Sequence, residues 1–427
     1  MKLCIEKAIY GGSGLARADG KAVFVPFTLP GEVVEAHVTE DRTSYASADL
    51  DRVLEASSAR VSAPCPYFGE CGGCHYQHAT YAQQLEMKVQ ILRETLERAH
   101  LKEIPAITIV QGEAFGYRNR IRLHVERGSS MLCYKKRGSH ANLAVDACPI
   151  AAPVLEEALK AFQNSSKKWQ LVESFEEIEF FTNTQQSSIL ITLWSSHGVN
   201  AVTEELQRLW PQLVDQVSQI SGAVVLSSER GKQRDAVLAQ VGEQALAYHS
   251  AGRDYHVSLG SFFQANRFLI DALVELVVAG QSGAVAWDLY AGVGLFAGAL
   301  APCFERLVAV ESAPRSVRDL RRNLDDGRHR VVASSTLDFL RRALGSRQPK
   351  PDFVVVDPPR AGLGKEVTAL LGEIRAEHII YVSCDPATLS RDLKSLLDSG
   401  YHLKNLYMVD LFPQTFHLES VAMLSLS

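Results

Sequence analysis

The stretch Asp288-Leu-Tyr-Ala-Gly-Val-Gly-Leu-Phe296 decides the fold of this chain. It closes an apolar strand predicted over 284–289 and opens a helical pattern. Glycines in such a turn let a nucleotide-like ligand approach the backbone at the carboxyl edge of a sheet. Four more apolar runs, at 307–310, 330–332, 353–356 and 379–382, alternate with helical stretches. The region beyond Ser261 is therefore predicted to be an α/β domain with a parallel sheet and helices on both faces.

The nucleotide ligand is indicated by the acid that ends the second of these strands. Glu311 stands where a carboxylate can accept hydrogen bonds from both hydroxyls of a ribose. The turn lacks the third glycine of a dinucleotide-binding motif, so the pattern favours S-adenosylmethionine over a dinucleotide. Asp338 follows the third strand, where it either meets an adenine amino group or begins a helix as its N-cap.

Two further strand ends carry polar or reactive groups. Asp357 begins Asp-Pro-Pro-Arg360, in which the prolines fix the backbone, so Asp357 either reads the polar edge of a base or forms an ordinary turn. Cys384 closes the next strand and precedes a helix. Helix N-termini and nearby cations lower a thiol pKa, so Cys384 is a candidate nucleophile, and a buried inert cysteine is the alternative. Glu419, in His417-Leu-Glu-Ser420, is either a general base or a surface carboxylate.

Three of the eight cysteines lie close together, at Cys65, Cys71 and Cys74. In a reducing compartment, clustered cysteines indicate metal binding rather than disulfides. Iron–sulfur and structural zinc sites both need four ligands, and Cys148 is the best fourth by context. The spacing leaves the choice between the two metals open.

The N-terminal half combines a small β-domain with a basic segment. Residues 1 to about 55 alternate like short strands with glycine-rich turns, which predicts a barrel of about five strands, either binding oligonucleotides or acting as a structural cap. A linker is predicted over 57–64, and an amphipathic helix from Ala79.

Between 117 and 142, seven cations accompany one acid. Alternating arginines at Arg118, Arg120 and Arg122 predict one strand face that either binds a phosphate backbone or is simply solvated.

Composition limits the class of protein. The 427 residues include 46% hydrophobic and 22% charged residues, which is typical of a globular protein of two to four domains. The net charge of -5 argues against a uniformly positive surface that coats nucleic acid. The first 25 residues hold no apolar signal region, and no apolar stretch is long enough to span a membrane. We expect a cytoplasmic monomer with no membrane partner.

Five motifs in one order resemble the RNA 5-methyluridine methyltransferase family, specifically its 23S rRNA (uracil-5-)-methyltransferase branch. They are 288–294, Phe263-Gln-Ala-Asn266, Asp357-Pro-Pro-Arg-Ala-Gly362, Ser383-Cys-Asp-Pro-Ala-Thr-Leu-Ser-Arg-Asp392 and His417-Leu-Glu-Ser420. The resemblance implies an OB-like TRAM barrel at 1–58, a central α+β iron–sulfur and RNA-binding domain at 59–255, and a Rossmann-like S-adenosylmethionine-dependent methyltransferase domain at 256–427.

The same resemblance implies roles for individual residues. Cys65, Cys71, Cys74 and Cys148 would hold a [4Fe-4S] cluster, and the cofactor pocket would be lined by Gln264, Tyr290, Glu311, Asp338 and Asp357. Cys384 would add to C6 of uracil, Asp357 would hold the ring, and Glu419 would remove the C5 proton. The substrate would be a single-stranded or flipped-out uridine, in 23S rRNA before tRNA, because stacking hides C5 and C6.

The chain departs from the family pattern at three positions, and three other classes of protein are rival interpretations. Ala291, Leu295 and Asp385 stand where the family commonly has Cys, a polar residue and Asn, and none of these changes removes a catalytic group. An adenine methyltransferase would need an aromatic residue where Arg360 stands. A 5-methylcytosine enzyme would need a second active-site cysteine, for which only Cys303 is available in the catalytic domain. A non-catalytic RNA-binding protein with the same fold is the rival from another class.

Overall fold

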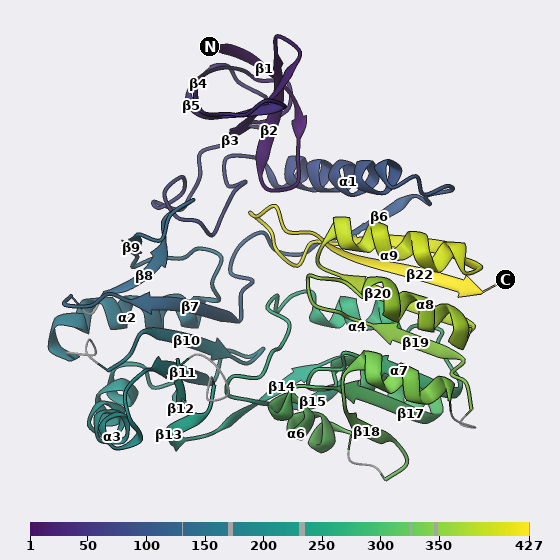
Figure 1. Cartoon of the computed structure of the whole chain (residues 1–427). Helices are drawn as coiled ribbons and strands as arrows, with labels where there is room; N and C mark the ends of the chain where they lie inside the picture. The colour runs from purple at the N-terminus through teal and green to yellow at the C-terminus, as the bar shows by residue number, and fades with distance from the viewer. Residues whose placement is uncertain (130, 170–173, 230–234, 325–326, 346–348, 427) are drawn as a thin grey trace.

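The computed structural model describes residues 1–427 except 130, 170–173, 230–234, 325–326, 346–348 and 427. Three parts follow one another along the chain: an N-terminal barrel, a central sheet and a larger C-terminal α/β sheet (Figure 1). The barrel lies above the other two parts, which stand side by side. Among the described residues, none of the helices combines the length and the apolar composition that crossing a bilayer requires.

The N-terminal part is a closed five-stranded barrel. Its strands, in the order β1-β2-β3-β5-β4, are β1 (Lys2–Ala8), β2 (Ser13–Ala18), β3 (Lys21–Pro26), β4 (Val33–Asp41) and β5 (Tyr45–Glu55). Alternate side chains point into the barrel, as Leu3 and Ile5 do on β1, and bury a small apolar core. The predicted barrel of about five strands is confirmed.

The central part is a seven-stranded sheet in the order β13-β12-β11-β10-β7-β8-β9. Its strands are β7 (Arg120–Val125), β8 (Leu132–Lys135), β9 (Asn142–Ala144), β10 (Glu177–Thr182), β11 (Ile189–Ser195), β12 (Ile220–Ser227) and β13 (Val237–Gly242). Two helices, α2 (Pro153–Trp169) and α3 (Val199–Gln216), share one apolar core with alternate residues of these strands. The helices therefore cover one face of the sheet and leave the other toward the C-terminal part.

Arg120 and Arg122 of β7 lie on one strand face, as predicted, and acids of the neighbouring strand pair with both. A guanidinium nitrogen of Arg120 lies 3.4 Å from a carboxylate oxygen of Glu179, and its Cζ is 4.1 Å from the centre of the Phe181 ring. Arg122 pairs with Glu177 and stacks over a tryptophan. Both acids lie on the neighbouring strand β10. The local charge excess is therefore partly compensated by acids that are distant in sequence and adjacent only in the sheet, and phosphate binding by this face stays a prediction.

The C-terminal part is an eight-stranded sheet in the order β18-β17-β16-β19-β20-β22-β21-β6. Its strands are β6 (Ile107–Val110), β16 (Gly283–Leu289), β17 (Phe304–Glu311), β18 (Arg330–Ala333), β19 (Phe353–Val356), β20 (His378–Ser383), β21 (Tyr401–Val409) and β22 (Glu419–Leu426). The strands from β16 to β20 are parallel, as predicted, so their carboxyl ends meet at one edge. Antiparallel β22 returns Glu419 to that edge, next to the end of β20.

Helices cover both faces of this sheet, as predicted. The helices of this part are α4 (Ile270–Val278), α5 (Leu295–Leu300), the short 3-10 helix η1 (Ala301–Cys303), α6 (Pro314–Asn323), α7 (Thr336–Leu344), α8 (Gly364–Ile374) and α9 (Pro386–Asp398). Apolar residues of α4 and α5 belong to one core, and those of α7, α8 and α9 belong to the core on the other face. A hairpin of β14 (Ala245–Ser250) and β15 (Arg253–Ser258) adds to the first core, which also reaches the central sheet.

The segment between the barrel and the central sheet contributes to the C-terminal part. The helix predicted from Ala79 is confirmed as α1 (Tyr81–Arg98), which Thr80 caps by accepting a hydrogen bond from the Gln83 N–H. Its apolar side packs in the same core as α9, and β6 extends the large sheet beside β21. The sequence places this segment in the central domain, whereas the structure adds it to the large sheet.

Candidate active site

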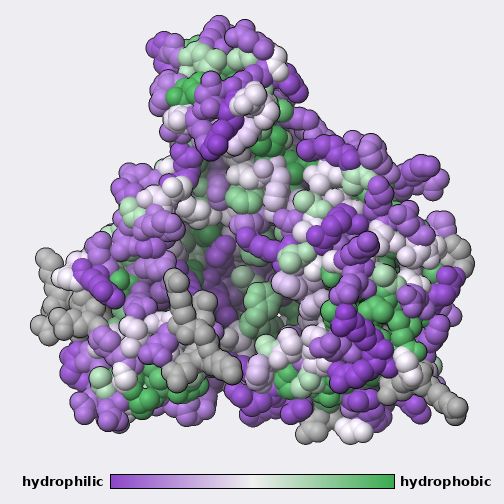
Figure 2. All heavy atoms as spheres, viewed as in Figure 1, coloured by the Kyte–Doolittle hydropathy of each residue, from purple (hydrophilic) through white to green (hydrophobic). Residues whose placement is uncertain are grey.

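A cavity of about 620 Å³ lies at the carboxyl edge of the parallel strands. Its walls are the loops after β16, β17, β19 and β20, together with segments near 263 and 415. In the space-filling view the surface is hollowed between the central and C-terminal parts, below the barrel (Figure 2). Six residues selected from the sequence line the cavity: Gln264, Tyr290, Glu311, Asp357, Cys384 and Glu419. The cavity is large enough for a nucleoside-sized ligand.

The glycine-rich turn after β16 forms one wall of the cavity. Tyr290, Gly292 and Gly294 all have positive φ angles, of 65°, 56° and 95°. A Cβ atom on Gly294 would also lie 2.7 Å from the side chain of Leu320. The turn therefore needs glycine for both conformation and space at this position, and it exposes backbone to the cavity.

Glu311 is fixed at the end of β17 by backbone hydrogen bonds. Its Oε2 accepts from the Gly292 N–H at 2.9 Å, and its Oε1 accepts from the N–H groups of Ser312 and Ala313 at 2.7 Å. The carboxylate thus ties the glycine-rich turn to the next loop. Because only Oε1 already accepts two hydrogen bonds, Oε2 can still accept one from a ligand hydroxyl.

Two carboxyl groups share the inner part of the cavity. Asp357 follows β19 and Glu419 begins β22, and the Gln264 amide donates to Asp357 Oδ2 at 3.3 Å. Burial raises the pKa of Asp357 to about 7. Burial and the charge of Asp357 raise the pKa of Glu419 well above its usual value. Two carboxyl groups in one buried site are typical of proton transfer.

Cys384 follows β20 and lines the same cavity, half-buried. Burial, Glu419 and Asp357 raise the pKa of its thiol to about 12, and Arg360 acts in the opposite direction. The position of Cys384 at the start of a helix predicts a lowered thiol pKa, and this prediction is wrong. Burial and two nearby carboxylates outweigh the cation. A thiol with a pKa this high would need a base to act as a nucleophile near neutral pH.

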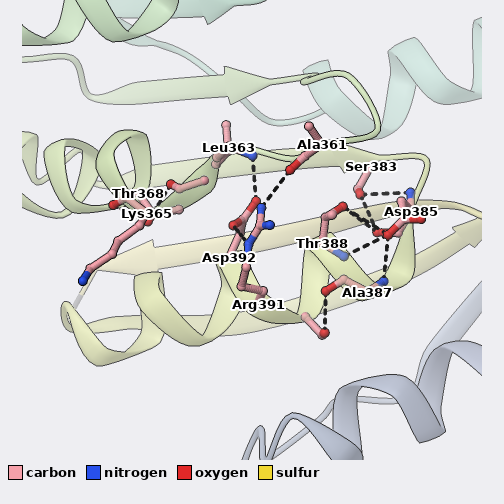
Figure 3. A network of polar contacts seen from close by, with 12 residues as sticks. Ala361, Leu363, Lys365, Thr368, Ser383, Asp385, Ala387, Thr388, Arg391 and Asp392 are labelled. Atoms are coloured by element: carbon pink, nitrogen blue, oxygen red, sulfur yellow. Dashed lines mark hydrogen bonds and ion pairs between the residues drawn. The ribbon is translucent and has the colours of Figure 1, made fainter.

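The loops that carry Asp357 and Cys384 are joined by a polar network (Figure 3). Asp385 Oδ1 accepts from the N–H groups of Ala387 and Thr388, at 3.0 and 2.9 Å, and so caps α9 directly after Cys384. Further along α9, Asp392 Oδ2 accepts from the Leu363 N–H at 2.7 Å. The helix therefore holds both strand-end loops in one arrangement.

The loop before Glu419 is held by the N-terminal half of the chain. The Gln414 carbonyl accepts from the His75 and Tyr76 N–H groups at 2.8 and 3.0 Å. The Gln84 side chain of α1 contacts Gln414 through both its oxygen and its nitrogen. Residues remote in sequence thus fix the position of the carboxylate at Glu419.

One predicted residue is not in the cavity, and several lining residues were missed. Asp338 is exposed in the first turn of α7, where its Oδ2 accepts from the Ser335 hydroxyl at 2.7 Å, and Ser335 rather than Asp338 caps the helix. Phe262, 67% exposed, and Phe412 line the cavity without having been selected. The sequence signal that could have identified Phe262 is the aromatic doublet 262–263 beside Gln264. No local sequence pattern marks Phe412.

The four candidate metal-binding cysteines line a second cavity, of about 170 Å³. Cys148, far from the other three in sequence, is among them, and the Tyr134 hydroxyl lies 3.6 Å from its Sγ. Arg118 also lines this cavity. Within the described residues, no three His, Cys, Asp or Glu side chains lie close enough together to hold one metal ion. The four cysteines predicted to share a metal site do line one cavity, and the bound metal stays a prediction.

Comparison with known proteins agrees with this architecture. Residues 80–335 and 344–426 match the tRNA (Uracil-5-)-methyltransferase family, and residues 4–50 match the TRAM domain family. The chain belongs to the tRNA (uracil-5-)-methyltransferase family. This methyltransferase is therefore an RNA uracil-5-methyltransferase that uses S-adenosylmethionine, and its N-terminal barrel is a TRAM domain. The predicted family and enzyme class are confirmed.

Individual relatives cover almost all of the methyltransferase. An uncharacterized RNA methyltransferase of Aquifex aeolicus is 33% identical, covering 99% of this chain and 98% of its own. A 23S rRNA (uracil(1939)-C(5))-methyltransferase of Shewanella amazonensis is 31% identical, covering 99% and 95%. The crystal structure of Pyrococcus abyssi tRNA (uracil-54, C5)-methyltransferase with S-adenosyl-L-homocysteine has a TM-score of 0.76 at 23% identity, covering 99% and 100%. The last comparison shows a shared fold over the whole chain.

Proposed function

We propose that this methyltransferase converts a uridine of 23S rRNA to 5-methyluridine through a covalent bond between Cys384 and C6 of the base. One observation carries the proposal: Cys384, Asp357 and Glu419 come from three different strand ends and line one cavity with the glycine-rich turn. A nucleophile, a buried base and a nucleotide-binding turn in one cavity are the groups that this reaction requires.

The chemistry assigns a task to each side chain. C5 of uracil is too weak a nucleophile to take a methyl group unaided, so addition of the Cys384 thiolate to C6 places electron density on C5. C5 then accepts the methyl group. Glu419 removes the C5 proton, and the electrons of that C–H bond restore the C5–C6 double bond as the Cys384 sulfur leaves. Asp357 orients the ring through its polar edge.

The cofactor position follows from the same cavity. Glu311 presents a carboxylate for a ribose hydroxyl, and the glycine-rich turn beside Tyr290 lets a ligand approach the backbone. Gln264 and Asp357 line the same cavity and are hydrogen-bonded to each other. When bound, S-adenosylmethionine supplies an electrophilic methyl group. Asp338 is left out of this assignment because it does not line the cavity.

Methyl transfer by Cys384 variants tests the mechanism. Cys384→Ala is expected to abolish transfer of labelled methyl from S-adenosylmethionine to 23S rRNA while RNA binding is retained. Cys303→Ala removes the other half-buried cysteine of this domain, outside the cavity, and should leave the rate unchanged. Glu419→Gln should accumulate a methylated protein–RNA adduct, which gel electrophoresis under denaturing conditions would detect. Full activity of Cys384→Ala would overturn the covalent step.

The choice of RNA rests on relatives that methylate 23S rRNA and cover nearly the whole chain at about 31% identity. Total RNA that lacks 5-methyluridine, incubated with the enzyme and labelled cofactor, should gain label in the 23S rRNA fraction. Label in tRNA alone would move the substrate to tRNA and leave the chemistry in place. A single-stranded oligonucleotide should be a better substrate than the same sequence in a duplex, because stacking hides C5 and C6.

We also propose that Cys65, Cys71, Cys74 and Cys148 hold a [4Fe-4S] cluster. Zinc with Zn–S bonds of about 2.3 Å would need its sulfurs within ~4 Å of one another. The described residues show no such close group. A cluster binds each cysteine through a different iron, so a wider set of thiols around one cavity suits it better. Arg118, whose Nε has no hydrogen-bond partner within the described residues, supplies positive charge beside the four thiolates.

A further inference from the structure

A tyrosine of the barrel reaches the segment that carries the nucleophile. Tyr10 lies in the turn between β1 and β2, and its hydroxyl donates to Asp385 Oδ2 at 3.3 Å. Asp385 follows Cys384 directly in the chain. The two bonded residues are 375 positions apart and belong to different parts of the molecule. A residue of the barrel is therefore hydrogen-bonded to the residue that follows the proposed nucleophile in the chain.

Neighbouring rings hold Tyr10 in this position. Its ring packs edge-on against Phe416, with centroids 5.3 Å apart, and Phe416 in turn packs against His75 at 4.6 Å. The turn itself fits closely: a Cβ atom on Gly12 would lie 3.0 Å from the His75 ring. The Tyr10 hydroxyl is thus presented by a packed junction rather than by a free surface side chain.

The two oxygens of Asp385 have different partners. Oδ1 accepts from the first N–H groups of α9, as Figure 3 shows, whereas Oδ2 accepts from Tyr10. An ionised Asp385 carboxylate would place a negative charge one residue from the Cys384 thiol. A hydrogen bond to that charge disperses it, and the bond also fixes the carboxylate that caps the helix.

We propose that Tyr10 is a positioning residue for the reaction, which acts through Asp385 to hold the Cys384 segment and to offset the negative charge beside the thiolate. The proposal rests on the function of Cys384 given above. It means that the barrel completes the active site as well as binding RNA. Docking of the barrel and formation of a competent nucleophile are then linked through a single hydroxyl group.

Three ionisable groups from other parts of the chain act on the Cys384 thiol. Glu419 from β22 and Asp357 from the loop after β19 both oppose the thiolate, and Arg360 favours it. Asp385 is the acid next in the chain, and Tyr10 is the donor from the barrel that meets it. Changing Tyr10 or Asp385 leaves the other three groups unaltered, so a change in thiol reactivity reports this pair.

The test measures alkylation of Cys384 by iodoacetamide as a function of pH, read by mass spectrometry of the peptide that contains it. In the full-length protein, Tyr10→Phe should lower the rate about threefold at a given pH, which corresponds to a thiol pKa raised by about half a unit. Asp385→Asn removes the charge and should increase the rate. In the Asp385→Asn background, Tyr10→Phe should have a smaller effect, because the amide oxygen is a weaker acceptor than the carboxylate and carries no charge. Tyr45→Phe, which removes a hydroxyl from a ring packed against Phe24 in the same barrel, is the matched control.

Methyl transfer gives the second measurement. Tyr10→Phe should lower kcat about threefold, with RNA affinity unchanged, and Tyr45→Phe should not lower it. Equal loss of alkylation rate in the wild-type and Asp385→Asn backgrounds, or no loss in either, would overturn the proposal. An effect on RNA affinity alone would overturn it as well. If Cys384→Ala keeps full activity, the assigned nucleophile fails, yet the alkylation profile still reports whether Tyr10 acts on this thiol.

Discussion

Lys88 of α1 and Asp410 of the loop before Glu419 form an ion pair of 2.5 Å in which both side chains are fully buried. The Lys88 ammonium also donates to the Phe412 carbonyl at 2.9 Å. The pair joins a helix near the N-terminus to the segment that carries the proposed base. Because neither charge reaches water, each depends on the other for compensation.

Lys88→Met is expected to lower the free energy of unfolding by about 3–5 kcal/mol, because it leaves the Asp410 carboxylate buried and unpaired. Chemical denaturation measures this loss. Lys7→Met, which removes a half-exposed partner of Glu94 on the same helix, should cost about 1 kcal/mol or less. The double change Lys88→Met with Asp410→Leu should recover much of the loss. A single variant as stable as the wild type would show that the buried pair is not what holds the loop.

Catalysis should increase with pH through the neutral range. The raised pKa values of Asp357 and Glu419 mean that this pair retains a proton near neutrality, and a base acts only after losing its proton. The profile of kcat/KM should therefore rise between about pH 6 and pH 9. Asp357→Asn removes the negative neighbour of Glu419 and should move the rise to lower pH, with a lower maximum because the ring is less well oriented. A flat profile, with chemistry shown to limit the rate, would contradict Glu419 as the base.

Asp288 should make the protein less stable as pH rises. Its side chain is completely buried, and burial raises its pKa to about 8. The folded state thus binds this proton more tightly than the unfolded state does. The resulting stabilisation is fully present below about pH 4 and is lost as pH rises through about 8.

Asp288→Asn should therefore remove several kcal/mol of pH dependence, since about 1.4 kcal/mol accompanies each unit of pKa shift. Unfolding by urea between about pH 5 and pH 9 measures the difference from the wild type. Asp215→Asn, which changes an exposed side chain in the last turn of α3, is the control and should leave the slope unchanged. Parallel curves for Asp288→Asn and the wild type would show that Asp288 has the same pKa in both states.

Protein prepared without oxygen should be brown and should contain about four iron atoms per chain. Cys71→Ser should lose the colour and most of the iron, because it removes one of four ligands. Cys133→Ser changes a buried cysteine of β8 that does not line the cavity, and it should keep both. Metal analysis and visible absorption give the answer. A colourless protein with one zinc per chain would replace the cluster by zinc.

The catalytic sheet was predictable because its signals are local. Each parallel strand is a short apolar run, and the groups of interest follow directly at its end, as Asp357 and Cys384 do. Parallel strands bring their carboxyl ends to one edge, so strand order alone is enough to place these groups together. The barrel was predictable for a similar reason, since alternation along each strand separates the inward and outward side chains.

The remaining features depend on contacts between distant segments. Arg120 and Arg122 carry a local charge excess in the sequence, and only the neighbouring strand supplies the acids that compensate them. The thiol pKa of Cys384 was expected to be low from its position before a helix, whereas burial among two carboxylates raises it. Asp338 lies near the right strand end, yet it is exposed and does not line the cavity.

The sequence by itself determined the fold class, the family and the chemical types of the active-site residues, because these depend on periodicity and on short motifs. Tertiary structure decided which charges are paired, which carboxyl groups have raised pKa values, and that Tyr10 of the barrel meets Asp385 beside the proposed nucleophile. The physical reason is that pKa values and ion pairs depend on burial and on distances of a few ångströms. Such distances are set by packing between segments hundreds of residues apart.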